Sequence, residues 1–233
     1  MLVEALEERY GATWWQLGRD DRDKRWRALN VMNNALTDAT NAELVSAVGV
    51  MRWLQEVSEI LILAQEVPRW TTAMGFAVWH IYPAMKSKRL TIRQKWAGGV
   101  RALKPTMKEE TDKLSAGDSK LAISANFVHA LDGAHMMMTV LKARDAGITS
   151  LRMVHDSFGT HAGDIETLNR VIREGFVEIY SGNSDPLQEL YERGLAALGR
   201  VNERKRKKLS LDAPPRIGTL DIGQVLHSPY FFC

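Results

Sequence analysis

The chain has 233 residues, 45% of them hydrophobic, with a formal net charge of +3 and a sequence pI near 9.0. This is ordinary globular composition, sufficient for one large core or two small ones, and its mild basicity permits a polyanionic partner without requiring one. A single cysteine, Cys233, excludes an internal disulfide and indicates a reducing compartment. No apolar run has membrane-spanning length, and the acidic N-terminus is unlike a signal peptide, so we expect a soluble cytoplasmic protein.

The first long element predicted is a helix over residues 40–66. Its apolar residues recur at three-to-four spacing, and Thr40 or Asn41 can cap its start. Pro68 ends it, because the residue before a proline is disfavoured in helical conformation.

A hairpin follows, with strands over 69–72 and 76–82 joined through Gly75, and a further strand is predicted over 89–96. Residues 86–108 contain eight Lys or Arg and no Asp or Glu, the strongest charge asymmetry in the chain. Such a stretch is either a solvated surface or a contact with a phosphate backbone, and Trp96 within it adds weight to the second interpretation. The residues to which we assign nucleic-acid binding are Lys86, Lys88, Arg89, Arg93 and Lys95.

Helical patterns return after this basic stretch. Residues 119–145 form the longest, with an apolar stripe of Phe127, Leu131, Met138 and Leu141. Gly133 weakens that helix by about 1 kcal/mol relative to alanine, which marks a place where the backbone approaches something closely. A strand over 148–154 and helices over 163–180 and 187–199 complete the predicted elements, the last opened by Pro186.

The strand over 148–154 leads into a turn that carries His155, Asp156 and Ser157, and Gly159 releases the chain. A carboxylate at the end of a strand is well placed to hold a divalent metal against phosphate oxygens. The alternative is a surface turn, since Asp and Ser favour turns through local hydrogen bonds. This short segment alone favours the turn.

A second polar segment, residues 126–135, lies on the predicted long helix. His129 and Asp132 share a face at helical spacing, and so do Asp132 and His135. The two histidines do not, because six residues turn a helix by about 600°, which argues against a simple two-histidine metal site. Read alone, the segment is better explained as a helix with satisfied polar residues.

Together, several segments resemble the C-terminal part of the single-subunit, bacteriophage-type DNA-directed RNA polymerases, the family that includes the mitochondrial enzymes. Their order and spacing carry the resemblance. The segments are Met51-Arg52-Trp53-Leu54, residues 69–78, Asn126-Phe127-Val128-His129, Asp132-Gly133-Ala134-His135, residues 154–160, residues 176–180 and Tyr230-Phe231-Phe232. Related DNA polymerases usually place Glu after the His-Asp pair, so Ser157 favours an RNA polymerase.

The resemblance implies roles for individual residues. Asp156 matches the second catalytic aspartate, in motif C of the palm, which binds Mg²⁺ for two-metal nucleotidyl transfer. His155 matches the neighbouring histidine, which positions the carboxylate or the RNA end, and His129 matches a histidine facing the minor groove of the RNA–DNA hybrid. The implied partners are a DNA template, an RNA transcript and nucleoside triphosphates, with no membrane.

The chain also departs from the family pattern. Motif A has no candidate, and Tyr10-Gly11 could be a remnant of motif B only with Leu2 where the family has lysine. Residues 1–40 show no clear resemblance, so we assign 41–233 to the palm and fingers of a catalytic domain and expect a phage-encoded protein of a bacterial cytoplasm. We expect no polymerisation by the chain alone, because Mg²⁺ requires more ligands, which a complementary polymerase chain would supply.

The predicted fold class is α+β and mostly helical, with a small antiparallel palm sheet whose strand-turn bears Asp156, surrounded by helices. Two alternative functions remain. One is a non-catalytic polymerase remnant or nucleic-acid-binding module, which the absence of a neighbouring reading frame with the missing motifs would favour. The other is a small metal-dependent hydrolase, which requires convergence of His129, Asp132, His155 and Asp156.

Overall fold

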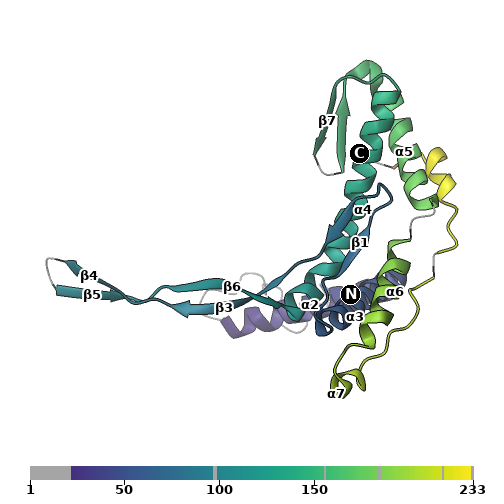
Figure 1. Ribbon diagram of the computed structural model, residues 1–233. Coiled ribbons are helices and arrows are strands. Elements are labelled where there is room, and N and C mark those ends of the chain that lie inside the picture. The colour runs from purple at the N-terminus through teal and green to yellow at the C-terminus, as the bar shows by residue number, and fades with distance from the viewer. Residues whose placement is uncertain (1–21, 97–98, 155, 183–184, 217, 232–233) are drawn as a thin grey trace. The chain divides into compact units, whose positions relative to one another are not determined.

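The computed structural model describes residues 22–96, 99–154, 156–182, 185–216 and 218–231. The chain divides into two compact units, Met1–Met51 and Arg52–Cys233. Long helices accompany small antiparallel sheets (Figure 1), which confirms the mostly helical α+β class. Among the helices described, none combines the length and apolar character that crossing a membrane requires.

The elements follow the chain in a simple order. The α-helices are α2 (Arg22–Glu43), α3 (Val45–Leu63), α4 (Ala116–Asp145), α5 (Ile165–Ser181), α6 (Pro186–Leu198) and α7 (Glu203–Arg206). Within the described residues, the 3₁₀ segments are η2 (Ala162–Asp164) and η3 (Ile222–His227). Four antiparallel pairs are formed by β1 (Arg69–Thr71) with β2 (Ala77–Trp79), β3 (Pro83–Arg89) with β6 (Thr106–Leu114), β4 (Ile92–Trp96) with β5 (Gly99–Leu103), and β7 (Leu151–Val154) with β8 (Ser157–Thr160).

The predicted start of the helix over 40–66 is wrong. Thr40 and Asn41 lie inside α2, which ends at Glu43, and α3 begins at Val45. Backbone bonds of 2.9 Å from Leu44 to Thr40 and from Val48 to Leu44 carry the helical turns across the break. Because the helix already runs from Arg22 to Glu43, a residue that could cap a helix is an interior residue here.

The predicted hairpin around Gly75 is confirmed as β1 and β2. Gly75 has φ 76°, a conformation that glycine adopts without a steric penalty. Its N–H donates to the Thr72 carbonyl at 2.8 Å, and the Phe76 N–H donates to the Thr72 hydroxyl at 3.2 Å. The turn residues therefore fix the pairing of two strands of only three residues each.

The main core of the second unit lies between α3, α4, α6 and the β1–β2 hairpin. Its large, fully buried side chains are Leu54, Ile60, Leu61, Trp70, Ile123 and Leu190. The hydroxyl oxygens of Ser58 and Ser119 lie 2.9 Å apart where α3 meets α4. On α6, a Cβ added to Gly194 would stand 2.8 Å from a Val57 methyl carbon and 2.6 Å from a Leu211 methyl carbon, so this glycine permits close packing.

Helix α4 confirms the predicted long helix and starts three residues earlier. Ser115 caps it by accepting the N–H of Asp118 at 3.3 Å. Its buried side chains are Ser119, Ile123, Phe127, Ala134, His135, Thr139 and Ala143. The predicted stripe is wrong at Leu141, which is exposed. The reason is that the C-terminal half of α4 packs on α5, along a different line from the one that packs in the main core.

That second contact forms a separate apolar cluster between α4 and α5. Its buried members are Ala143, Ile148, Leu168, Val171 and Ile172. Leu151 of β7, Phe158 of β8 and Phe231 near the carboxyl end pack against it. The β7–β8 pair thus rests on helices, as its half-buried inner side chains indicate.

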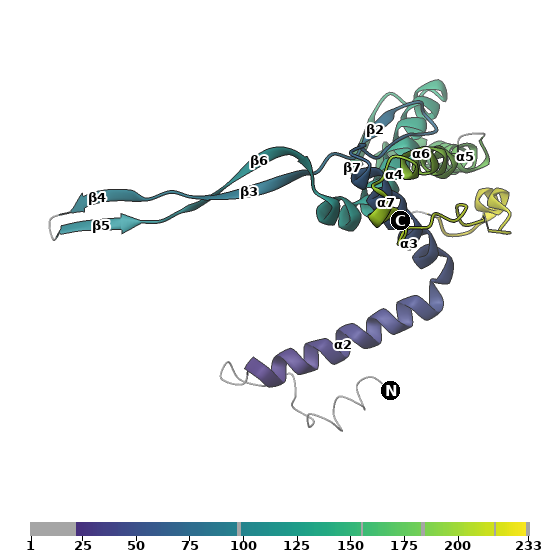
Figure 2. The same ribbon diagram turned by 60° about the horizontal axis from the view of Figure 1, so that its bottom comes forward.

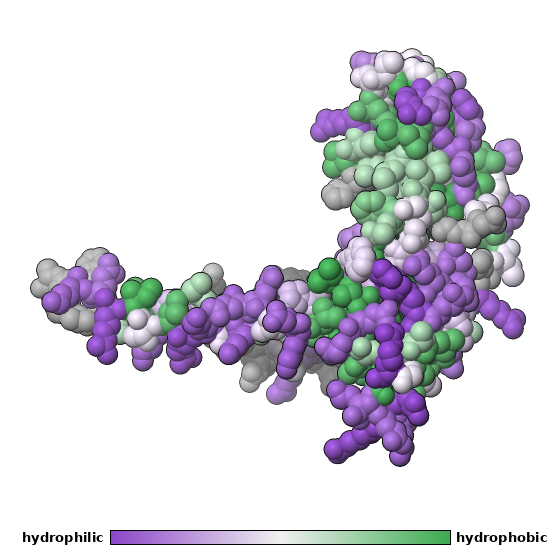
Figure 3. Space-filling view, viewed as in Figure 1, coloured by the Kyte–Doolittle hydropathy of each residue, from purple (hydrophilic) through white to green (hydrophobic). Residues whose placement is uncertain are grey.

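Strands β3–β6 continue into β4–β5 as one long two-stranded ribbon (Figures 1 and 2). The predicted strand over 89–96 is confirmed as β4 but begins later, at Ile92, because Arg89 is the last residue of β3. At the base of the ribbon, the Ser115 N–H donates to the Tyr82 carbonyl at 2.7 Å. In Figure 3 the ribbon is largely hydrophilic, and the described side chains of 85–95 and 102–110 are nearly all exposed.

The predicted helices after the β7–β8 pair are confirmed as α5 and α6. Asp185 caps α6 by accepting the N–H groups of Leu187 and Gln188, with Pro186 in the first turn. Glu66, just after α3, forms ion pairs with Arg193 of α6, at 2.9 Å, and with Arg200. These ion pairs join the end of α3 to the C-terminal helices.

Candidate functional site

Asp156 is an exposed residue between β7 and β8. The predicted strand over 148–154 is shorter, Leu151–Val154, and pairs with β8 so that Val154 faces Ser157. His155 lies outside the described residues. The carboxylate of Asp156 is therefore open to solvent beside a short strand pair whose inner side chains pack on α4 and α5.

The support under this strand pair includes a buried histidine. His135 of α4 stands edge-to-face with Phe158 of β8, the ring centroids 5.9 Å apart. Its Nε2–H donates to the Ile172 carbonyl of α5 at 2.9 Å. Since Phe158 is two residues from Asp156, α4 and α5 jointly hold the backbone next to the exposed carboxylate.

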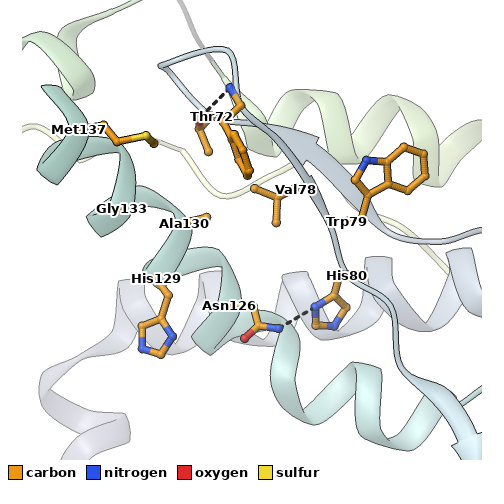
Figure 4. Close-up of a pocket in the computed structure, with 10 residues that line it drawn as sticks. Thr72, Val78, Trp79, His80, Asn126, His129, Ala130, Gly133 and Met137 are labelled. Carbon is orange, nitrogen blue, oxygen red and sulfur yellow. Dashed lines mark hydrogen bonds between the residues drawn. The ribbon is translucent and has the colours of Figure 1, made fainter. Parts of the chain in front are cut away.

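His129 is exposed on α4 at the edge of a pocket of about 350 Å³ between that helix and the β1–β2 hairpin. Figure 4 shows the residues that line it: Thr72, Phe76, Val78, Trp79, His80, Asn126, His129, Ala130, Gly133 and Met137. A Cβ added to Gly133 would meet no described atom within 4 Å. No close approach to another segment is thus seen at Gly133, and the glycine lines open space instead.

His80 and Asn126, which line this pocket, belong to a polar group that sequence reasoning missed. The Nε2–H of buried His80 donates to the Ser119 carbonyl at 2.9 Å, and its Nδ1 accepts from Asn126 at 3.1 Å (Figure 4). Asn126 also donates to the Tyr82 hydroxyl at 3.1 Å. Burial lowers the pKa of His80, and the bond to Ser119 opposes that effect only in part. Strand alternation, which places Val78, His80 and Tyr82 on one face, is the signal that could have revealed the group.

Asp132 points to a different neighbour from His129. The pKa of Tyr180 on α5 is raised, first by burial and then by the negative charge of Asp132. Asp132 therefore lies toward α5, whereas His129 lies toward the β1–β2 pocket. His129 and Asp132 are three residues apart on α4 and could share a helical face, but they contact different parts of the structure.

The five basic residues predicted to bind nucleic acid all lie exposed on the ribbon, on β3 and β4. Lys88 forms a 3.1 Å ion pair with Glu109 of β6, and Lys86 faces the same glutamate in the strand register. Arg93 and Lys95 face Ala102 and Val100. Positive charge on the ribbon is thus partly offset by Glu109 in the β3–β6 pair, whereas Arg93 and Lys95 have neutral cross-strand neighbours on β5.

The described residues do not by themselves form a metal site. Among them, no three His, Cys, Asp or Glu side chains are grouped as metal ligands. A hydrolase site that unites His129, Asp132 and Asp156 therefore has no support from the part of the chain that is described. Mg²⁺ takes several oxygen ligands, and the single exposed carboxylate of Asp156 would be an incomplete set.

Comparison with known proteins gives the family. A family model described as DNA-dependent RNA polymerase matches residues 4–200, and this chain belongs to that family. The match confirms the resemblance inferred from the sequence and extends into the segment 1–40.

Three plant proteins illustrate the similarity. DNA-directed RNA polymerase 3B, chloroplastic, of Nicotiana tabacum is 36% identical over 198 residues, which are 84% of this chain and 18% of that protein. DNA-directed RNA polymerase 1, mitochondrial, of Nicotiana sylvestris is 35% identical over 187 residues, 80% of this chain and 17% of that protein. DNA-directed RNA polymerase 2A of Nicotiana tabacum is 36% identical over 187 residues, 80% of this chain and 51% of that protein. The chain thus spans between about a sixth and a half of these relatives.

Proposed function

We propose that this chain forms part of the active centre and nucleic-acid-binding surface of a single-subunit DNA-directed RNA polymerase. The observation that carries the proposal is its membership of the family, over residues 4–200. The exposed carboxylate of Asp156, on a strand pair braced by α4 and α5, supports it. Nucleotidyl transfer by this family needs carboxylates held rigidly and open to substrate phosphates, and such a position meets that need.

Asp156 contributes one ligand to a Mg²⁺ site in this proposal. When bound, Mg²⁺ neutralises charge on phosphate oxygens and lowers the barrier to phosphoryl transfer. The described residues do not complete such a site, and in this proposal other parts of the polymerase supply the remaining ligands. The substrates are nucleoside triphosphates, a DNA template and an RNA transcript.

Two other surfaces bind nucleic acid in this proposal. His129, exposed at the edge of the β1–β2 pocket, donates to the minor groove of the RNA–DNA hybrid. The basic residues of β3 and β4 contact phosphates, because they are exposed side chains on an extended ribbon. His155 supports the carboxylate or the RNA end.

A chimera tests the role of Asp156. This chain replaces the matching 198 residues of the tobacco chloroplastic polymerase 3B, and RNA extension is measured on a preformed hybrid with Mg²⁺. We expect extension by the chimera and at least a thousandfold loss in Asp156→Asn, about 4 kcal/mol of transition-state stabilisation. Asp145→Asn, an exposed aspartate at the end of α4, is the matched control. Equal extension by both variants would remove Asp156 from the reaction.

A second candidate is a nucleic-acid-binding module that has lost the reaction, which the exposed basic ribbon favours. The purified chain alone then binds a labelled RNA–DNA hybrid, and the chimera carries out no extension. Extension by the purified chain alone, lost in Asp156→Asn, would contradict both candidates, since it requires a complete metal site within residues 1–233.

A further inference from the structure

The last described segment of the chain is anchored by one buried arginine. Arg173 of α5 is only 8% exposed. Its Nη1 donates to the carbonyl oxygens of Val225, at 2.7 Å, and Ser228, at 2.5 Å. Its Nε donates to the Asn169 side chain at 3.0 Å, which fixes the guanidinium on its own helix. One side chain therefore holds both the end of η3 and the residue that follows it.

These bonds are stronger than ordinary backbone bonds. A hydrogen bond with a charged donor is roughly twice as strong as a neutral one. The Val225 carbonyl belongs to the last turn of η3, where carbonyls lack intrahelical partners and a cation is favourable. Nη1 reaches both carbonyls while Nε of the same guanidinium bonds Asn169, so the position suits an arginine better than a lysine, which has only one nitrogen.

The anchored segment ends on an aromatic side chain that enters the interior. Arg173 lies over the ring of Phe231, 5.6 Å from its centroid. Phe231 stands edge-to-face with Phe176 of α5 at 5.0 Å, and Phe176 does the same with His135 of α4 at 5.6 Å. Aromatic pairs in this geometry stabilise beyond their buried area.

The series of rings ends beside the exposed carboxylate. His135 stands edge-to-face with Phe158 of β8, which follows Asp156 by two residues. Phe231 and Phe158 both pack on the apolar cluster between α4 and α5. A continuous set of contacts therefore links the segment from Ile222 to Phe231 with the strand pair that flanks Asp156.

We propose that Arg173 is a positioning residue that locks the segment Ile222–Phe231 onto α5, and that this docked segment stiffens the β7–β8 pair and so fixes Asp156. The meaning for catalysis rests on the proposed function, whereas the mechanical link does not. The segment that covers this surface of α5 is Ile222–Phe231 of the same chain. Whether that segment is docked or released therefore determines how rigid the β7–β8 pair is.

Hydrogen exchange of the full chain tests this link without nucleic acid or metal. In Arg173→Gln and Arg173→Lys, amides of 222–228 exchange at least tenfold faster, and amides of 157–160 exchange several-fold faster. The control is Arg170→Gln, on the same helix, which lines the same pocket as Leu226, His227 and Ser228 but whose guanidinium pairs with Glu174, and it changes neither region. Amides of 54–62 in α3, part of the main core, report whether each variant is folded.

A spectroscopic signal at the strand pair separates positioning from general stability. With 4-fluorophenylalanine at position 158, the ¹⁹F resonance shifts and broadens in Arg173→Gln and in Phe231→Ala, and stays unchanged in Arg170→Gln. If Arg173→Gln does not fold, Phe231→Ala and Arg173→Lys carry the test. Unchanged exchange of 222–228, or a released segment with an unchanged fluorine signal, would overturn the proposal. These measurements do not depend on the activity of the Asp156 chimera. The catalytic role of Asp156 and the mechanical link through Arg173 can therefore be disproved independently.

Discussion

The Nδ2 atom of Asn126 lies 3.1 Å from Nδ1 of His80, while Nε2 of the same ring lies 2.9 Å from the Ser119 carbonyl oxygen. Both partners belong to α4, so a single helix determines both hydrogen bonds of the ring. The carbonyl accepts and the amide donates, which leaves His80 neutral, with its proton on Nε2. Burial favours this neutral form and lowers the pKa of His80 below its usual value of 6.5.

The free energy of unfolding should therefore fall in mild acid. The folded chain binds a proton on His80 less readily than the unfolded chain, so the contribution is complete above about pH 6.5 and is lost as pH falls below it. His80→Gln is expected to be less stable by about 1–3 kcal/mol at pH 7.5, with a flatter decline toward pH 5. Urea denaturation at pH 7.5, 6 and 5 measures both, and parallel declines would contradict the role of His80.

Gly194→Ala should destabilise the fold. The new methyl would stand 2.8 Å from a carbon of Val57 and 2.6 Å from one of Leu211, too close for packed atoms. A cost of about 1–3 kcal/mol is expected in thermal or urea denaturation. Gly199→Ala is the control at the end of the same helix, because its Cβ meets only the Ala196 carbonyl oxygen, at 3.8 Å. A neutral result at position 194 would mean that α3 and α6 pack less closely than the structure shows.

Gly133→Ala separates folding from binding. The added methyl meets no described atom within 4 Å, and alanine is the better helix former, so the variant gains about 0.5–1 kcal/mol in the free energy of unfolding. The same methyl narrows the pocket beside His129, so affinity for an RNA–DNA hybrid falls several-fold in fluorescence anisotropy. A variant that is more stable and binds equally well would show that this pocket receives no nucleic acid.

The ribbon's basic residues should contribute unequally to binding. Arg93→Gln with Lys95→Gln removes two charges that face neutral residues, whereas Lys88→Gln removes a charge already paired with Glu109. Removal of one cation that neutralises a phosphate lowers the slope of log affinity against log salt by about 0.7–0.9. We expect a decrease of between one and two for the double variant and well below one for Lys88→Gln.

Lys205→Gln with Lys208→Gln is the charge-matched control for that experiment. These two lysines belong to the basic run 203–208, which we place outside the binding surface. Their substitution changes net charge by the same amount as the double variant on the ribbon. Equal slopes for the two double variants would assign the salt dependence to overall charge and not to the ribbon.

Local signals explain which elements could be predicted from the sequence. Helices α5 and α6 have apolar periodicity, and the turn at Gly75 combines glycine with flanking strand formers. The ribbon is only partly predictable from the sequence. Strand β3 pairs with β6, which follows it only after β4 and β5. Both faces of the ribbon are exposed, so its side chains show no alternation between buried and exposed positions.

The residues of the candidate site also divide into those with a local sequence signal and those without one. Asp156 and His129 are predictable because short sequence patterns carry them. His80 and Arg173 depend on carbonyls of distant segments, Ser119, Val225 and Ser228, which only the folded chain brings near. For Arg173 the available signal is weak: an arginine directly after Ile172, beside the apolar stripe of α5. The alternation along residues 78–82 marks His80 as an inward-facing side chain, but the hydrogen-bond partners of His80 and Arg173 leave no pattern along the chain.

The single bond between the Ser115 N–H and the Tyr82 carbonyl has a consequence for how such a chain can change over time. The ribbon begins at Pro83 and ends at Leu114, so both of its ends lie next to this hydrogen bond. A hairpin of another length or charge could be exchanged there while the cap of α4 and the packing around Trp70 stay as they are. The ribbon is thus a replaceable module, free to diverge faster than the scaffold that carries it.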